Sequence, residues 1–330
     1  MRWVFGIGIG IVVIGISAMF VATRSKSSMV SPIITVVARP LDRYAIPNLK
    51  KTPFDSSYIV LDEVTATAAS YTVYTFHYIS EGKKVTGVAH IPSTPKPQNG
   101  FPVIVQFRGY VDPAHYYPGE GTEHSAEVFA SNGFISLAPD FLGYGGSDKP
   151  STDVFEERFQ THTAALTLLA SVGSLPTADS TRVGVWGHSN GGQIALTVLE
   201  AAPKAYPAVL WAPVSKPFPY SVLYYTDEAD DHGTLLRREL AKFEGIYDAD
   251  LYSLTNYLEN IKGPLQIHQG TADDAVPIKW TDDFVKMLRD KNITIGYFTY
   301  PGANHDLTPG WNTVIARDVA FYASRLTVGK

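Results

Sequence analysis

The sequence contains no cysteine among its 330 residues, and its charged residues are few, at 18% of the chain. The absence of cysteine excludes disulfides, thiolate metal sites and a lipidated N-terminal cysteine, and it leaves the redox compartment open. The net charge of -5 provides no surplus of basic residues for phosphate backbones, so we exclude a nucleic-acid partner. What the chain has instead is apolar residues, at 45%, which is enough for a large buried core.

The N-terminus has no charged residue between Arg2 and Arg24. About 20 apolar residues suffice to cross a bilayer as a helix, so we interpret residues 1–24 as a membrane anchor. A cleaved signal peptide is the alternative, and the protein would then be secreted, although this apolar core is longer than usual and lacks a convincing A-x-A site. Positive charge flanks both ends, so it orients the span only weakly. We expect the catalytic domain on the extracytoplasmic side, after a polar linker over residues 25–53.

Residues 54–330 have the pattern of one α/β domain. The stretch YTVYTFHYIS-EGKK-VTGVAHIP predicts an antiparallel hairpin. Short apolar runs follow (VIVQF, FISLAP, RVGVW, AVLWAP, LQIHQG and IGYFTY), and segments of helical length separate several of them. Buried strands that alternate with helices predict a mainly parallel sheet covered on both faces.

The interval from about residue 214 to 263 is too long for a simple crossover and contains two helical patterns. We interpret it as a helical cap over the carboxyl edge of the sheet, with two ordinary surface helices as the alternative. Its aromatic stretch FPYSVLYY, residues 218–225, suits either the core of the cap or an apolar substrate pocket. An acidic run nearby would form a solvated face, hold a divalent ion or receive a substrate amine, and it comprises Asp227, Glu228, Asp230, Asp231 and His232.

The motif GHSNGG, residues 187–192, stands between the apolar run VGVW and a predicted helix. A strand, then G-x-S-x-G, then a helix is the setting of a nucleophile elbow, in which the glycines permit a tight turn and the serine stands at its tip. Ser189 is therefore the predicted nucleophile. The alternative is that Ser189 only caps the helix that follows.

A serine hydroxyl needs a base, and the base needs a carboxylate to orient it. In this architecture the order along the chain is serine, acid, histidine. The block HQGTADDAVP places Asp273 or Asp274 directly after a buried strand, and PGANHDL places His305 after the next one. These side chains are expected at the carboxyl edge of the sheet, where chemistry collects in open α/β sheets.

The three blocks GHSNGG, HQGTADDAVP and PGANHDL resemble the catalytic blocks of the α/β-hydrolase superfamily, in its prolyl oligopeptidase and dienelactone-hydrolase-like branch. The resemblance implies an α/β-hydrolase fold with no cofactor. It places the acid on Asp273 and the base on His305, while Asp274 and Asp306 remain structural or solvated neighbours. It also implies packing or structural roles for His188, Asp140 and Tyr144.

Acyl transfer also requires hydrogen-bond donors where charge develops on the carbonyl oxygen. One expected donor is the backbone N–H of Asn190, the residue after the nucleophile. The second is the backbone N–H of Tyr110, in the loop after VIVQF, where relatives of this branch have H-G-G or Y-G-G and this chain has Arg108-Gly109-Tyr110. Arg108 itself is expected to do no more than form an ion pair.

These residues predict a serine hydrolase that works through an acyl-enzyme on a small peptide or ester, without metal or cofactor. The G-x-x-D-x-x-V-P block favours a peptidase of the prolyl oligopeptidase type. A carboxylesterase or lipase of small acyl esters is the alternative, because a 330-residue chain has no room for the large propeller that gates many such peptidases. A membrane-tethered binding protein without catalysis is a more remote alternative, and the sequence gives no oligomeric state.

Overall fold

The computed structural model describes residues 38–226 and 229–326. The predicted anchor, residues 1–24, and the first part of the predicted linker lie outside the described residues. Within the described ranges, no helix combines the length and the apolar character needed to span a bilayer.

Nine strands form one sheet in the described part of the chain, in the order β1-β2-β3-β5-β4-β6-β7-β8-β9. The pairs along β1, β2, β3 and β5 are antiparallel, and all pairs from β5 through β9 are parallel, which confirms the predicted mainly parallel sheet. The strands are β1 (Val60–Thr67), β2 (Tyr71–Ser80), β3 (Lys83–Pro92), β4 (Phe101–Phe107), β5 (Ile135–Pro139), β6 (Ala178–His188), β7 (Ala208–Trp211), β8 (Leu265–Gly270) and β9 (Ile295–Tyr300).

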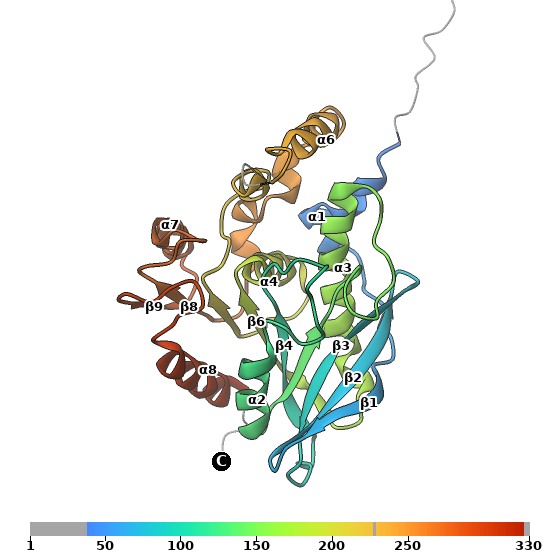
Figure 1. Ribbon diagram of the computed structural model, residues 1–330, viewed down its shortest axis with the longest axis vertical. Helices are drawn as coiled ribbons and strands as arrows, with labels where there is room; N and C mark the ends of the chain where they lie inside the picture. Colours follow the sequence, from blue (N-terminus) through green and yellow to red (C-terminus); the bar gives the residue numbers. More distant parts are fainter. Residues whose placement is uncertain (1–37, 227–228, 327–330) are drawn as a thin grey trace, which may run out of the picture. The chain divides into compact units, whose positions relative to one another are not determined.

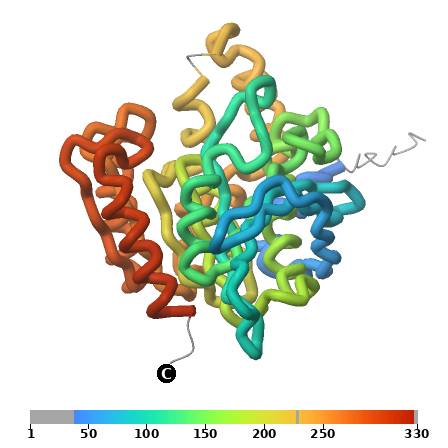
Figure 2. The backbone as a smooth tube through the Cα atoms, turned by 60° about the horizontal axis from the view of Figure 1, so that its bottom comes forward, coloured from blue at the N-terminus to red at the C-terminus, as the bar shows by residue number. Residues whose placement is uncertain are grey.

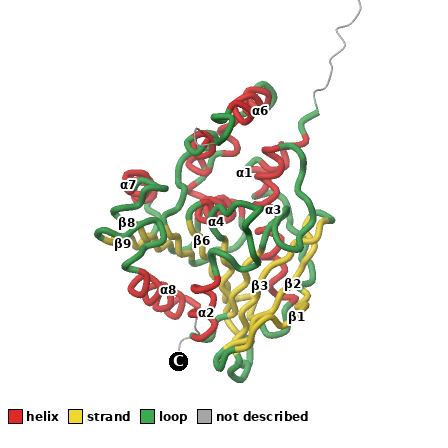
Figure 3. Tube along the Cα trace, viewed as in Figure 1, coloured by secondary structure: helices red, strands yellow, loops and turns green. Residues whose placement is uncertain are grey.

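Helices cover the sheet on both faces, as the buried strands require. One face carries α2 (Glu123–Ser131) and α8 (Trp311–Leu326), which lie side by side in Figure 3. Their apolar residues join a cluster that includes Phe129, Trp186 and Tyr322. The other face buries a larger cluster under α3 (Val154–Ser171), α4 (Asn190–Ala201) and α7 (Ile278–Asp290), and the short η2 (Val172–Ser174) follows α3.

The chain between β7 and β8 forms short helices: α5 (Tyr220–Leu223), α6 (Thr234–Glu244), η4 (Ala249–Tyr252), η5 (Leu254–Asn256) and η6 (Leu258–Asn260). In Figures 1 and 2 the yellow-orange segment with α6 stands out from the body formed by the sheet and its helices. An aromatic cluster holds it against the N-terminal end of α3, with Phe155, Phe159, Phe218 and Phe243 in mutual ring contact.

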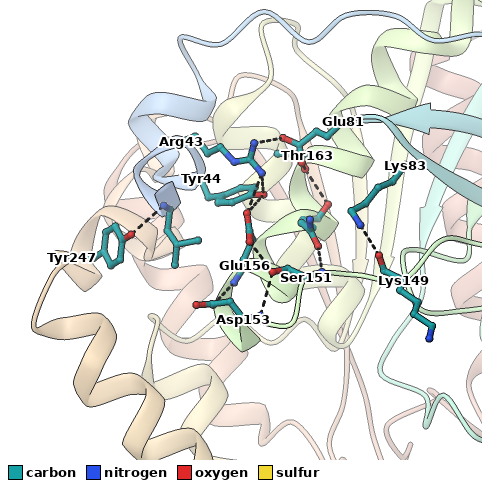
Figure 4. Close-up of polar contacts among 12 residues, drawn as sticks. Arg43, Tyr44, Glu81, Lys83, Lys149, Ser151, Asp153, Glu156, Thr163 and Tyr247 are labelled. Atoms are coloured by element: carbon teal, nitrogen blue, oxygen red, sulfur yellow. Dashed lines mark hydrogen bonds and ion pairs between the residues drawn. The ribbon is translucent and has the colours of Figure 1, made fainter. Parts of the chain in front are cut away.

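The predicted linker over residues 25–53 is wrong for its second half. Residues 40–49 form η1 (Pro40–Tyr44) and α1 (Ile46–Leu49), and their apolar side chains are buried. Figure 4 shows Arg43 of this segment reaching toward Glu81 and Glu156, at 3.4 and 3.1 Å, while the Leu41 N–H donates to the Tyr247 hydroxyl. Apolar burial and these contacts therefore fix this segment to α3 and α6, which a short proline-punctuated sequence does not reveal.

Candidate active site

Ser189 occupies a sharp turn between β6 and α4, in the left-handed region with φ 56° and ψ -119°. A non-glycine residue at positive φ is strained, as expected of a nucleophile elbow. The turn is tight enough that a Cβ on Gly191 would overlap the carbonyl oxygen of Phe107, so this position requires glycine. The Ser189 side chain makes no capping hydrogen bond to α4, although it holds the N-cap position. Its hydroxyl is therefore not engaged as a helix cap.

Asp273 and His305 meet just beyond the ends of β8 and β9. His305 Nδ1 lies 3.0 Å from both carboxylate oxygens of Asp273. The carboxylate also accepts hydrogen bonds from the N–H groups of Ala275 and Val276 and from the Gln269 amide. Burial alone would raise the pKa of Asp273, but the hydrogen bonds from His305 and Val276 outweigh it and hold this pKa below its ordinary value. The carboxylate is therefore ionised and oriented toward His305, whereas Asp274 is exposed.

Ser189 lies at the same edge of the sheet, because β6, β8 and β9 run parallel. The chain neighbour of Ser189, His188, packs its ring on His305 at 4.6 Å between centroids and places its Nε2 3.1 Å from the His305 carbonyl oxygen. Burial, together with His305, lowers the pKa of His188 to about 4, so this ring is neutral. Within the described residues the Ser189 hydroxyl forms no hydrogen bond with His305, and such contacts often tighten only when substrate binds.

The loop after β4 lies against the serine turn. A Cβ on Gly109 would stand 3.3 Å from the Ser189 Cβ, so Gly109 lies directly beside the serine turn. Both Tyr110 and Asn190 line the same cavity. The two residues from which oxyanion donors are predicted therefore share one cavity wall.

Arg108 holds this loop in place, and in the part of the chain that the structure describes it does so without the expected ion pair. Its guanidinium lies 4.6 and 4.0 Å from the ring centres of Tyr116 and Tyr144 and donates to the carbonyl oxygens of Gly109 and Asp140. The Asp140 carboxylate accepts instead from the hydroxyls of Tyr116 and Thr86, both at 2.6 Å. Arg108, Asp140 and Tyr144 therefore form the support beneath the site.

A cavity of about 550 Å³ opens beside Asn190 and Tyr110. Its wall comes from the loop after β5, from α3 and from the α5–α6 segment, and it includes Phe141, Phe155, Val222 and Leu236. Sequence reasoning missed one charged residue of this wall, Arg158. The available signal was spacing, since Arg158 stands three residues after Phe155 and four before His162, on the face of α3 that packs inward.

Among the described residues, the remaining sequence candidates do not contact the His305–Asp273 pair. Asp227 and Glu228 lie outside the described residues, and no metal-binding group of acidic and histidine side chains occurs in ranges 38–226 and 229–326. The Asp231 carboxylate accepts hydrogen bonds from the N–H groups of Gly233, the N-cap residue of α6, and Leu235, in its first turn. Asp306 is exposed. In the stretch 218–225, Phe218 is core and Tyr224 packs on Trp280 at 4.5 Å.

The comparisons with known proteins agree with these motifs. The sequence pattern of the prolyl oligopeptidase family matches residues 121–326, which is more than half of the chain. A Schizosaccharomyces pombe protein named as a candidate dipeptidyl aminopeptidase is 32% identical over 142 residues, 43% of this chain but only 16% of that protein. YtmA of Bacillus subtilis, an uncharacterised peptidase, is 24% identical over 251 residues, covering 75% of this chain and 91% of YtmA.

Solved structures share the fold at low sequence identity. An acetyl xylan esterase from Paenibacillus sp. R4 superposes with a TM-score of 0.65 at 19% identity, covering 83% of this chain and 91% of the esterase. A puromycin-hydrolysing peptidase of Mycobacterium tuberculosis reaches 0.62 at 17% identity, covering 80% of this chain and 41% of that one. The mainly parallel sheet is thus an α/β-hydrolase fold, and the chain is a serine hydrolase that belongs to the prolyl oligopeptidase family.

Proposed function

We propose that Ser189, His305 and Asp273 form the catalytic triad of a peptidase of the prolyl oligopeptidase type. The observation that carries the proposal is the hydrogen-bonded pair of His305 and Asp273 at the sheet edge that also holds the strained Ser189 turn. The other ring nitrogen of His305, Nε2, is left to act on the serine. This is the arrangement that activates a hydroxyl near neutral pH.

In the proposed reaction the Ser189 oxygen attacks the substrate carbonyl carbon while His305 Nε2 takes the hydroxyl proton. The N–H groups of Asn190 and Tyr110 stabilise the negative charge on the carbonyl oxygen. The tetrahedral intermediate then collapses, and His305 returns the proton to the departing amine or alcohol. Water, activated by the same histidine, hydrolyses the acyl-enzyme and frees Ser189. Asp273 keeps the His305 tautomer fixed and stabilises the imidazolium in both steps.

An esterase of small acyl esters is the second candidate. One observation favours it: the acetyl xylan esterase aligns over 91% of its own length, so a chain of this size needs no propeller to match a complete esterase. The B. subtilis protein named as a peptidase also aligns over 91% of its length. Chain length therefore does not distinguish a peptidase from an esterase, and kinetic measurements are needed to do so.

The test is labelling of the full chain by a fluorophosphonate, followed by kinetics on matched p-nitrophenyl esters and aminoacyl p-nitroanilides. We expect labelling of the native chain and its loss in Ser189→Ala and His305→Ala. Ser324→Ala is the matched control, because that serine lies exposed on α8. Labelling that persists in Ser189→Ala would overturn the assignment, and the preferred substrate series decides between peptidase and esterase.

The segment from residue 214 to 263 is proposed to act as a cap on the substrate cavity, since Val222 and Leu236 contribute to the cavity wall. Enlarging the wall tests this: Leu236→Ala is expected to change the preferred acyl length without loss of fluorophosphonate labelling. An unchanged chain-length preference would contradict the cap.

Residues 1–24 are proposed to anchor the chain in a membrane with the hydrolase domain extracytoplasmic. Membrane fractionation followed by alkaline extraction tests whether the chain is anchored in the membrane. Protease added from outside tests on which side of the membrane the hydrolase domain lies. Intact-mass analysis distinguishes a cleaved signal peptide, because cleavage would remove these residues.

A further inference from the structure

The cavity beside the proposed nucleophile contains an arginine, Arg158, whose charge has no partner of opposite sign among the described residues. Arg158 extends from α3 into the cavity wall and is largely covered by its neighbours. Burial lowers the pKa of Arg158 to about 10, which leaves the guanidinium protonated at neutral pH. A covered cation is unfavourable unless it is paired, so this side chain requires an explanation.

The hydrogen bonds of Arg158 do not neutralise it. Its Nη2 donates to the side-chain oxygens of Asn190, at 3.3 Å, and Gln193, at 3.0 Å, and both acceptors are neutral amides. Across residues 38–226 and 229–326, no carboxylate forms an ion pair with Arg158. A guanidinium has five N–H donors, so most of its donor capacity is left for a ligand.

The other titratable groups of the cavity wall do not change this balance. Arg108 is engaged with two aromatic rings and two carbonyl oxygens, and burial lowers the pKa of His162 to about 3, so that ring is neutral. Glu157 is the carboxylate among the lining residues, and it is exposed. As the direct neighbour of Arg158 on a helix, it projects about 100° away from it. The cavity therefore carries a net positive charge.

The position of the cavity relates this charge to the acyl part of a substrate. Both proposed oxyanion donors, Asn190 and Tyr110, are lining residues of the cavity, whereas Ser189 and His305 are not. Asn190 also links the two features directly, because its backbone N–H faces the reacting carbonyl in the proposed mechanism while its side chain contacts Arg158. A group bound by Arg158 would lie a few bonds from the scissile carbonyl on the acyl side.

We propose that Arg158 binds a carboxylate on the acyl part of the substrate, so that the enzyme prefers acyl groups ending in a second acid. This inference rests on the proposed triad and specifies its substrate class. The planar fork of a guanidinium matches a carboxylate with two parallel hydrogen bonds, which lysine cannot reproduce. Two sources offer this chemistry, an acidic side chain next to a scissile peptide bond and the half-ester of a short dicarboxylic acid. A substrate amine at this position would meet an unpaired cation and be rejected.

The experiment compares acid and neutral members of matched substrate pairs on the full chain. For the ester source the pair is p-nitrophenyl hydrogen glutarate and p-nitrophenyl pentanoate, each corrected for its uncatalysed rate. For the peptide source it is the p-nitroanilides of N-acetyl-glutamate and N-acetyl-glutamine. We expect kcat/KM to favour the acid member of at least one pair by about tenfold or more, since a charge-assisted hydrogen bond contributes that much selectivity. The pair that shows the preference identifies the source.

Substitution separates a carboxylate site from a structural role. In Arg158→Gln the acid-to-neutral ratio of kcat/KM is expected to fall about tenfold to a hundredfold, and Arg158→Lys should keep part of it. The matched control is Arg238→Gln, an exposed arginine of α6 that pairs with Glu239, and its ratio should equal that of the native chain. A ratio unchanged by Arg158→Gln would overturn the proposal, because Arg158 would then only hold Asn190 and Gln193 in place.

A binding measurement tests the subsite without turnover. Glutarate is added to Ser189→Ala protein and to the Ser189→Ala/Arg158→Gln double variant, and the thermal midpoint is followed. A rise in the first protein that the second lacks supports the carboxylate site even if the native chain neither labels nor hydrolyses, which would be a failure of the triad alone. No rise in either protein, with labelling of the native chain intact, would overturn the site and leave the triad standing.

Discussion

Among the histidine–aspartate pairs of the described residues, two have the same separation and different surroundings. His305 and Asp273 lie 3.0 Å apart at the sheet edge, and His268 and Asp318 lie 3.0 Å apart inside it. The His305 side chain is 20% exposed, while His268 and Asp318 are fully buried. We call the first the open pair and the second the closed pair.

The difference lies in the second nitrogen of each ring. In the closed pair Nε2 contacts Asp318 and Nδ1 contacts the Tyr300 hydroxyl at 2.7 Å, so both nitrogens are occupied. In the open pair Nδ1 contacts Asp273, and no hydrogen bond of Nε2 occurs within the described residues. A general base needs a nitrogen that can reach the proton it accepts. Residue types alone therefore do not define a catalytic pair, since the unoccupied nitrogen and its access decide it.

The closed pair stabilises the packing of α8 on the sheet. The Asp318 carboxylate of α8 accepts hydrogen bonds from the indole N–H groups of Trp186 and Trp211, at 3.3 and 2.8 Å, and from the Gln266 amide. These donors lie on β6, β7 and β8. One buried carboxylate thus ties a helix to three neighbouring strands.

Removing the base of the open pair should have the largest effect. His305→Gln is expected to lower kcat/KM by about 10⁴-fold or more, because Ser189 would lose its proton acceptor. The thermal midpoint should change by only a few degrees. Steady-state kinetics on the preferred p-nitrophenyl or p-nitroanilide substrate measures the loss.

His124→Gln serves as its control, since that histidine of α2 is 82% exposed. It should keep native activity. If His305→Gln kept kcat/KM within tenfold of the native value, the open pair would not be catalytic and would not differ in role from the closed pair.

The closed pair should give the opposite result, with stability lost and activity kept. Asp318→Asn is expected to lower the free energy of unfolding by about 3–5 kcal/mol, because the new amide cannot accept from all its neighbours and leaves His268 and an indole N–H unpaired. Urea unfolding at pH 7 measures it, and Asp290→Asn, an exposed aspartate at the end of α7, is the control. Undiminished stability in Asp318→Asn, or a loss of turnover per folded molecule, would argue against a purely structural pair.

Low pH should lower the free energy of unfolding through His188, whose ring packs on His305 of the open pair. Its pKa is lowered from an ordinary 6.5 to about 4 by burial and by His305, so the folded chain holds it neutral where the unfolded chain would protonate it. The contribution of neutral His188 to the free energy of unfolding is therefore complete above about pH 6.5. It is lost as the pH falls toward 4, and the loss is at most about 3 kcal/mol.

Urea unfolding at pH 7.0, 5.5 and 4.5 measures this effect. In His188→Gln the decline in unfolding free energy between pH 7.0 and 4.5 should be smaller than in the native chain, and part of it should persist because His90 and His162 also have lowered pKa values. His124→Gln should show the native decline. Equal declines in the native chain and His188→Gln would mean that His188 is not held neutral.

Much of the open pair was predictable from the chain, because each of its residues sits in a local motif at the end of an apolar strand. Ser189, Asp273 and His305 follow β6, β8 and β9 in the order that the architecture demands. The closed pair carries no such signal. His268 lies inside the apolar run LQIHQG, and its meaning depends on Asp318, which α8 supplies 50 residues later.

Other parts of the fold were not predicted from the sequence, for related reasons. β1 was not predicted, since VLDEVTAT is mostly exposed at the edge of the sheet and lacks an alternating apolar pattern. The short η1 and α1 segment became a linker in the sequence interpretation because Leu41, Tyr44 and Leu49 have no periodic context of their own. Their burial requires partner surfaces from distant elements, which only the folded chain provides.

The smallest effect is expected at Tyr110, a residue that is 73% exposed. If its N–H is the oxyanion donor, Tyr110→Phe should change kcat by less than about threefold, because the substitution leaves the backbone intact. Tyr110→Pro removes the N–H and should lower kcat by about 10²–10³-fold with fluorophosphonate labelling slowed in parallel. A large loss in Tyr110→Phe would instead place the donor on the tyrosine hydroxyl. The open pair would then depend on a side chain, as the closed pair depends on Tyr300, and the second donor would have to be reassigned.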